Sequence, residues 1–212
     1  MNKPAPQKRG RGRPPKQVGA RQDTRRALIR CGTEILTEKG FHVTGIDEVL
    51  KRVGVPKGSF YHYFASKEDF GLAVIDNYAS YFAAKLDRWL EDEAVAPLQR
   101  MRNFVEDAKH GIERHHYRRG CLIGNLGQEL GALSDTFRGP LEAVFLDWQR
   151  RVATCFRAAQ SAGEIGASAD PDHLAAFFWI GWEGAILRAK LVQGTEPLDL
   201  FADAFFAGLP RE

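Results

Sequence analysis

The stretch that decides the fold is residues 55–64, which read VPKGSFYHYF. Pro56 suits the start of a helix, because its fixed φ is already helical and its missing N–H is not needed there. Phe60 and Phe64 fall one helical turn apart, on the face that would be buried. The polar side chains project from the other face: Lys57, Ser59, Tyr61 and His62. We therefore expect a short helix with an apolar inner face and a donor-rich outer face.

Two helical segments are expected upstream of this stretch. From Asp23 apolar residues recur at three- and four-residue spacings, and Gly40 supplies a left-handed stop. Thr44 is a good N-cap for a second helix of about two turns, with Asp47 at its third position, and Gly54 ends that helix. Two short helices joined by a glycine-containing turn follow the helix-turn-helix plan.

A fourth helix is expected to begin just after the quoted stretch. Ser66 can cap it, with Asp69 three residues later, and Lys67 then takes its first position, where an ammonium group can hold a phosphate. Gly58 would let the backbone approach DNA closely. Because lysine and tyrosine reach phosphates or base edges, the outward side chains predict a surface that contacts the major groove.

Charge is divided unevenly along the chain. Residues 1–70 carry 15 Lys and Arg against 7 Asp and Glu, whereas residues 71–212 carry 15 against 20. A basic first third on an acidic remainder is typical of a protein that meets a polyanion at one end. Residues 1–22 contain four prolines and no acidic residue, so we expect a disordered arm. Arg11 and Arg13 resemble an AT-hook core, and the arm either enters a minor groove or attracts phosphates generally.

These residues together resemble the DNA-binding domain of the tetracycline-repressor (TetR) family. The resemblance covers residues 23–71 and rests on Phe41, Thr44, Ile46, residues 55–64 and residues 66–68. It implies that bases or phosphates are faced by Lys57, Gly58 and Tyr61, and the DNA backbone by Thr44, Ser59, His62 and Lys67. It also implies a homodimer that binds double-stranded operator DNA with two recognition helices, about one DNA turn apart.

The remainder of the chain is expected to be a helical bundle. No strand-like alternation follows Phe70, and breaks divide residues 71–212 into about six helices. The breaks are placed at residues 93–97, 119–120, 133–140, 163–171 and 194–197. Two long helices, residues 141–160 and 172–192, are apolar nearly all round and need two packing partners, which favours a dimer interface over core packing within one chain. The small residues expected to allow close approach there are Gly181, Gly184 and Ala185.

The most distinctive part of this bundle is residues 118–129, RRGCLIGNLGQE. Cys121, Asn125 and Gln128 share one helix face by their spacing. Cys121 also lies near a helix N-terminus with arginines and histidines just upstream, and positive potential there would favour a thiolate. The alternative is that Cys121 is a small core residue, as most buried cysteines are.

A narrower resemblance concerns residues 119–138 and 182–190. They are similar to a TetR subgroup that includes the acrylate-responsive and the N-ethylmaleimide-responsive repressors, and the acrylate-responsive type is similar over nearly the whole chain. In the electrophile-sensing members, the sensor cysteine matches Cys121 and a lysine matches Lys190. The further cysteine that the electrophile sensor has after Glu129 is missing here.

A small anionic effector such as acrylate needs an apolar cage with one or two cationic or amide anchors. The candidate ligand-binding residues are Phe104, Trp148, Phe178 and Trp182 for the cage, with Arg119, Asn125, Lys190 and Cys121 as polar partners. The expected function is a DNA-binding transcriptional repressor, released by acrylate or a related small electrophile or carboxylate. Covalent modification of Cys121 is the alternative trigger.

Two other classes of function remain open. Cys121 with His115 or His116 as base would make a thioesterase-like nucleophile pair, but no oxyanion-hole motif accompanies it and the DNA-binding motif would be unexplained. An architectural DNA-binding protein, in which the basic arm dominates, is the second alternative.

Composition excludes several classes. No hydrophobic run approaches the ~20 residues of a membrane helix, and no cleavable leader is apparent, so we expect a cytoplasmic protein. Cys31, Cys121 and Cys155 are widely spaced, which predicts neither a disulfide framework nor a metal site. No cofactor is expected.

Overall fold

The computed structural model describes residues 18–211, and over that range it contains helices and no strands, which confirms the predicted all-α class. Its elements are α1 (Val18–Lys39), α2 (Ile46–Val53), the 3-10 helix η1 (Lys57–His62), α3 (Lys67–Leu90), α4 (Pro97–Arg114), α5 (Leu122–Leu130), α6 (Asp135–Ser161), α7 (Pro171–Val192) and α8 (Glu196–Ala207). Predictions for most of the basic arm, including Arg11 and Arg13, concern residues outside the described range. Among the described helices, none has the length and hydropathy needed to cross a membrane.

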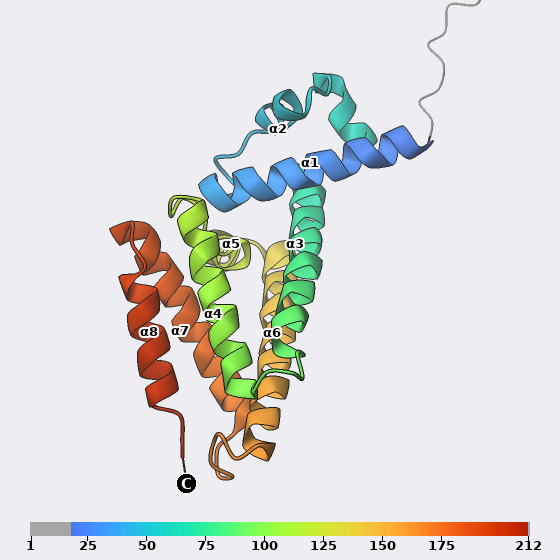
Figure 1. Ribbon diagram of the computed structural model, residues 1–212. Coiled ribbons are helices and arrows are strands. Elements are labelled where there is room, and N and C mark those ends of the chain that lie inside the picture. The colour runs from blue at the N-terminus through green and yellow to red at the C-terminus, as the bar shows by residue number, and fades with distance from the viewer. Residues whose placement is uncertain (1–17, 212) are drawn as a thin grey trace, which may run out of the picture.

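The helices form a small layer set across one end of a larger bundle. Figure 1 shows α1 lying across that end, with α2 on its outer side, while α3 runs from this layer into the bundle beside α6. The short helix α5 lies at the junction of the two parts. The bundle core is aromatic: Trp148 and Trp179 are buried with ring centroids 5.0 Å apart. This arrangement places α5 between the core of the bundle and the helix-turn-helix layer, which is formed by α1, α2 and η1.

The predicted start of α1 and the predicted N-cap of α2 are both wrong in detail. The first helix begins at Val18 rather than Asp23, because Arg21 hydrogen-bonds the distant carbonyl of His62 and so extends the helix through a tertiary contact. The N-cap of α2 is Gly45, without a side-chain cap, since the Thr44 hydroxyl donates instead to the Gly40 carbonyl at 2.6 Å.

The expected third helix is the 3-10 helix η1. Its hydrogen bonds span three residues, from the Ser59 N–H to the Pro56 carbonyl and from the Tyr63 N–H to the Phe60 carbonyl. At six residues η1 is longer than most 3-10 helices, which are used in short pieces, and its buried aromatic side chain anchors it to α3. The left-handed stops at Gly40 (φ 87°) and Gly54 (φ 69°) are confirmed.

Two further predictions fail within the bundle. α6 begins at Asp135 and contains Pro140, although a break was expected there. Gly139 has no Cβ to clash with the proline ring, which removes part of the usual penalty. Gly181 faces α8 in the same chain, because a Cβ there would lie 2.1 Å from the Phe201 ring. Its small size therefore serves packing within the chain, whereas Gly184 is exposed and a Cβ there would meet no atom within 4 Å.

Candidate DNA-binding surface and ligand pocket

The recognition turn η1 is held by buried aromatic side chains, as predicted. Phe60 and Phe64 are buried, and the Phe64 ring lies edge-on to Phe70 of α3 at 5.0 Å. Gly32 of α1 allows this packing, because a Cβ there would lie 2.4 Å from the Phe70 ring. The Ser66 hydroxyl accepts the Asp69 N–H and caps α3, which confirms the predicted cap.

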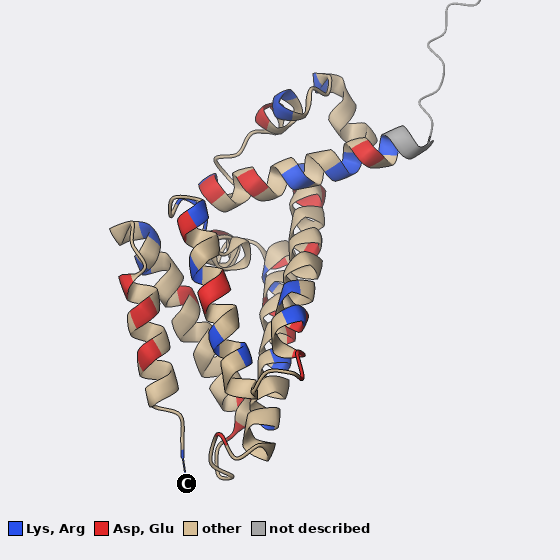
Figure 2. Cartoon of the chain, viewed as in Figure 1, with Lys and Arg blue, Asp and Glu red and all other residues tan. Residues whose placement is uncertain are grey.

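The outward side chains of η1 remain open to solvent. Tyr61 is 70% exposed, and the Lys57 side chain is 82% exposed while its Nζ contacts Asp47 Oδ2 at 2.5 Å. An exposed ion pair of this kind is worth little, so Lys57 can exchange Asp47 for a phosphate. His62 is also exposed and Ser59 is half-buried, and a Cβ on Gly58 would meet no atom within 4 Å. Figure 2 shows Lys and Arg along α1 and on the outer elements of this layer.

Two of the predicted DNA contacts are engaged within the protein. Thr44 is 2% exposed and its hydroxyl bonds the Gly40 carbonyl, so it does not reach the outer surface in this conformation. Lys67 Nζ lies 3.3 Å from the His42 carbonyl and 4.6 Å from the centre of the Phe41 ring.

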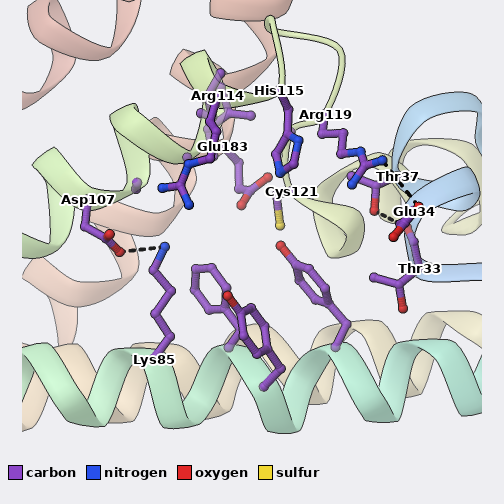
Figure 3. Close-up of a pocket in the computed structure, with 18 of the residues that line it drawn as sticks. Thr33, Glu34, Thr37, Lys85, Asp107, Arg114, His115, Arg119, Cys121 and Glu183 are labelled. Atoms are coloured by element: carbon purple, nitrogen blue, oxygen red, sulfur yellow. Dashed lines mark hydrogen bonds and ion pairs between the residues drawn. The ribbon is translucent and has the colours of Figure 1, made fainter. Parts of the chain in front are cut away.

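A cavity of about 740 Å³ lies in the bundle, close to the helix-turn-helix layer. Its walls come from α1, α3, α4, α7 and the loop before α5 (Figure 3). Three of the predicted ligand residues line it: Arg119, Cys121 and Trp182. Three others pack behind its wall, with Phe178 stacked on Trp182, Trp148 on Trp179 and Phe104 against Phe82. The position is therefore close to the one expected, but Tyr78, Phe82, Trp179 and Glu183 were missed as wall residues.

Cys121 is the N-cap of α5, and it is buried in the wall of the cavity. The sulfur accepts the Gly124 N–H at 3.4 Å. Burial, followed by the negative charge of Glu183, raises the pKa of Cys121 well above 9.0. The expectation of a thiolate stabilised by positive potential is therefore wrong. The nearby Arg119 is turned toward α1, where it pairs with Glu34 and Glu38.

Glu183 of α7 is the acidic neighbour of this thiol. Figure 3 shows its carboxyl group beside the Cys121 side chain. Burial raises the pKa of Glu183 to about 7, although its interaction with the Cys121 thiol opposes the shift. Glu183 Oε1 is buried and has no hydrogen-bond partner among the described residues. Gly124 makes room for the carboxyl group, since a Cβ there would lie 1.9 Å from Glu183 Oε2.

The predicted anchors Asn125 and Lys190 join the two layers of the protein instead of lining the cavity. Asn125 Nδ2 donates to the Thr37 carbonyl of α1 at 2.9 Å, and Lys190 Nζ donates to Asn125 Oδ1 at 3.2 Å. Arg119 Nε reaches Glu38 of α1 at 2.8 Å. Residues 119–125, which include the cavity residue Cys121, are thus hydrogen-bonded to the last turns of α1.

Glu129, near the C-terminal end of α5, makes a further contact of this kind. Its carboxylate accepts the backbone N–H groups of Phe41 and His42 at 2.7 and 2.6 Å, and lies 2.9 Å from the His42 ring. Sequence analysis missed this contact, because no local pattern relates residues so far apart. Among the described residues, no cluster of His, Cys, Asp and Glu suits a metal ion.

An exposed recognition turn on a helix-turn-helix layer, bonded to a bundle that encloses a cavity, defines a one-component DNA-binding regulator. Residues 28–74 match the family model described as bacterial regulatory proteins, tetR family, and residues 97–205 match the tetracyclin repressor-like C-terminal domain. The chain belongs to the tetracycline-repressor family of transcriptional regulators, a family of repressors rather than enzymes, whose members bind operator DNA and dimerise.

Individual relatives agree with this assignment. The chain is 56% identical to the transcriptional regulator AcuR of Cereibacter sphaeroides, over 94% of this chain and 91% of that protein. It is 36% identical to the transcriptional repressor DhaR of a Mycobacterium species, over 90% of this chain and 94% of that protein. A crystal structure of a TetR regulatory protein from Rhodobacter sphaeroides is 55% identical, with a TM-score of 0.85 over 88% of this chain and 98% of that chain. Reduced NemR of Escherichia coli is 27% identical, with a TM-score of 0.82 over 90% of this chain and 98% of that chain.

Proposed function

We propose that this repressor is released from its operator by a small unsaturated carboxylate, with acrylate as the first candidate, or by a related small electrophile that enters the cavity. The observation that carries the proposal is the position of α5. Its N-cap, Cys121, lines the cavity, whereas Asn125 and Glu129 bond the end of α1 and the loop that follows. Any ligand that displaces α5 must therefore disturb the helix-turn-helix layer.

The coupling follows from differential binding. A ligand lowers DNA affinity only if it prefers a conformation in which the two recognition turns of the dimer are wrongly spaced. The contacts of α5 are polar and directional, so a small shift of this helix changes the orientation of α1 relative to the bundle. The resemblance of residues 119–138 to acrylate-responsive repressors is the reason for choosing acrylate.

A second candidate trigger is covalent modification of Cys121. Its thiol lines the cavity, so a bound electrophile would lie within reach. The raised pKa of this thiol argues against spontaneous reaction as a thiolate, and the two triggers require different experiments.

The dimer would use the exposed apolar face of α7, together with α6. Among the exposed large apolar side chains of α7, four are spaced by three, seven and four residues, which places them on one helix face: Phe177, Ile180, Leu187 and Leu191. Such a stripe on a long helix is typical of a surface covered by a second copy. The operator DNA would be contacted by the residues of η1 and by the start of α3: Lys57, Gly58, Ser59, Tyr61, His62 and Lys67.

The test is a gel-shift titration on DNA from the protein's own promoter region. The panel contains short unsaturated acids, aldehydes and quinones, because acrylate fills only a small part of the cavity and a larger effector would also fit. We expect acrylate or a close analogue to release the DNA, whereas its saturated analogue propionate serves as control. Unchanged binding across the panel would refute the effector class. Retained response in Cys121→Ser would favour simple occupancy over covalent modification.

A further inference from the structure

The cavity contains a polar pair that simple ligand binding does not use. Cys121, the N-cap of α5, and Glu183 of α7 both line it, and Gly124 of α5 leaves room for the Glu183 carboxyl group beside Cys121. Glu183 Oε1 is buried and has no hydrogen-bond partner among the described residues. A buried oxygen without a partner costs stability, so its retention needs an explanation.

Thiol chemistry here needs a base. Burial and the charge of Glu183 keep Cys121 protonated at neutral pH, and a neutral thiol is a poor nucleophile. Glu183 is the carboxyl group whose charge acts most strongly on the thiol, and its unpartnered Oε1 leaves an acceptor free for the thiol proton. The carboxyl group thus raises the thiol pKa in the ground state but can take the proton when the sulfur attacks.

We propose that Glu183 is the proton acceptor for covalent addition of Cys121 to an uncharged α,β-unsaturated carbonyl compound. The inference rests on the ligand-relieved function proposed above. Sγ bonds the β-carbon of the ligand while the thiol proton passes to the Glu183 carboxylate, and the π electrons move toward the α-carbon and the carbonyl oxygen. Glu183 then returns the proton to the α-carbon. The product is a thioether that retains every atom of both reactants.

The ligand class follows from charge. A carboxylate held at the thiol would place a second negative charge beside Glu183, which is unfavourable. An amide, ester, aldehyde or ketone carries no such charge. The cavity is also lined by cationic side chains, among them Lys85 and Arg114, so acrylate can bind there with its carboxylate away from Glu183. Acrylate then acts by occupancy, whereas acrylamide also reacts.

Other titratable groups around the cavity are less suited to accept the thiol proton. They are Arg30 and Glu34 of α1, Tyr78, Tyr81, Lys85 and Arg88 of α3, Asp107 and Arg114 of α4, His115 and Arg119 of the next loop, and Lys190 of α7. Asp107 is paired with Lys85. Tyr78 stays protonated because burial raises its pKa well above 10.0, and Arg119 is paired with Glu34. Burial lowers the pKa of His115 from 6.5, so this residue is the rival base.

The test measures adduct formation on the full-length protein by intact-mass spectrometry with acrylamide. Saturated propionamide is the control ligand and should leave the mass unchanged. Wild type should gain one acrylamide, and Cys121→Ser none. Glu183→Gln keeps the size of the side chain but removes the base, and should slow the addition by about 100-fold or more. Gly124→Ala, which displaces the carboxyl group, should also slow it, whereas His115→Gln should not.

The pH dependence separates a proton acceptor from a structural residue. In wild type the rate should rise with pH through about 7, where Glu183 loses its proton, and then level off. In Glu183→Gln it should keep rising above pH 9, because only the thiolate then reacts. Circular dichroism and operator binding of each variant verify that it is folded.

The proposal is overturned if wild type forms no adduct at Cys121, or if Glu183→Gln reacts at the wild-type rate. Operator release by acrylate in that same preparation would leave the repressor function standing. Conversely, Glu183-dependent addition in a protein whose operator binding responds to no ligand would support the chemistry and refute the proposed function.

Discussion

Glu129 Oε2 accepts a 2.7 Å hydrogen bond from the backbone N–H of Phe41, and this bond joins α5 to the loop between α1 and α2. Gly40, the residue before Phe41, has a φ of 87°, and a Cβ there would lie 2.5 Å from the same carboxylate oxygen. Only glycine fits this position without displacing the carboxylate. The loop after α1 and the C-terminal end of α5 are therefore in direct contact, and this contact joins the helix-turn-helix layer to the bundle.

Glu129→Ala should weaken the coupling between the two parts. Loss of hydrogen bonds to a charged acceptor should lower the free energy of unfolding by about 1–3 kcal/mol, measured by urea denaturation. The effector concentration needed for half-release of operator DNA should also change in the gel-shift assay. Glu106→Ala, on α4, removes an exposed carboxylate elsewhere and is the control. Equal responses of the two variants would contradict a specific role for Glu129.

The same contact predicts a loss of stability in acid. Burial raises the pKa of Glu129, but hydrogen bonds from His42 and Phe41 outweigh it and lower the pKa below 4.5. A depressed folded-state pKa contributes stability above 4.5, and this contribution is lost as the pH falls through the folded value. Urea melts of wild type and Glu129→Gln should therefore converge on acidification. A constant difference between them would exclude this linkage.

Lys57→Ala should weaken operator binding without affecting the fold. The side chain is exposed, so the free energy of unfolding should stay within about 0.5 kcal/mol of wild type. Loss of one phosphate contact should reduce the slope of log affinity against log salt by about 1. Arg211→Ala removes one positive charge near the opposite end of the molecule (Figure 1) and is the control. If both variants gave the same salt slope, Lys57 would not contact the DNA.

Ile180→Glu should dissociate the dimer. Ile180 on α7 and Leu200 on α8 are both 73% exposed, so a charge at either position costs little within one chain. Only Ile180 belongs to the apolar stripe proposed as the interface, and burying its replacement carboxylate there would be unfavourable. Light scattering after size exclusion should give a monomer for Ile180→Glu and a dimer for Leu200→Glu. The reverse pattern would move the interface to α8.

Glu183 should make the protein less stable as the pH rises from 4.5 to about 7. Its pKa is raised in the folded state, so the unfolded chain loses this proton first and stability falls across that window. The full effect is on the order of 3–4 kcal/mol, since the pKa moves from 4.5 to about 7 and one pH unit corresponds to ~1.4 kcal/mol. Glu183→Gln should remove this fall, measured by urea denaturation at pH 5 and pH 8. An unchanged pH dependence in the variant would show that Glu183 ionises normally.

The helix-turn-helix layer was predictable from sequence because its signals are local. Phe60 and Phe64 lie one turn apart, Gly54 ends α2, and Ser66 caps α3, each within a few residues of its partner. Thr44 shows where such reasoning fails. Its hydroxyl could either cap the N-terminus of α2 or donate to the Gly40 carbonyl, and it donates to the carbonyl.

The ligand site was predictable only as a neighbourhood. Cys121 and Trp182 line the cavity as expected, but Asn125 and Lys190 bond each other and α1 instead. A helix periodicity shows which residues share a face, but it does not show what lies opposite that face.

Local patterns along the chain were therefore sufficient for the all-α class, the position of η1 and the excess of positive charge in the first 70 residues. Tertiary structure decided the ionisation of Cys121, which depends on Glu183 from another helix and on burial that no local pattern reveals. It also decided the contact of Glu129 with Phe41, 88 residues away in sequence. The physical reason is range: capping and periodicity act over one or two turns, whereas burial and buried charge depend on every helix that packs around a site.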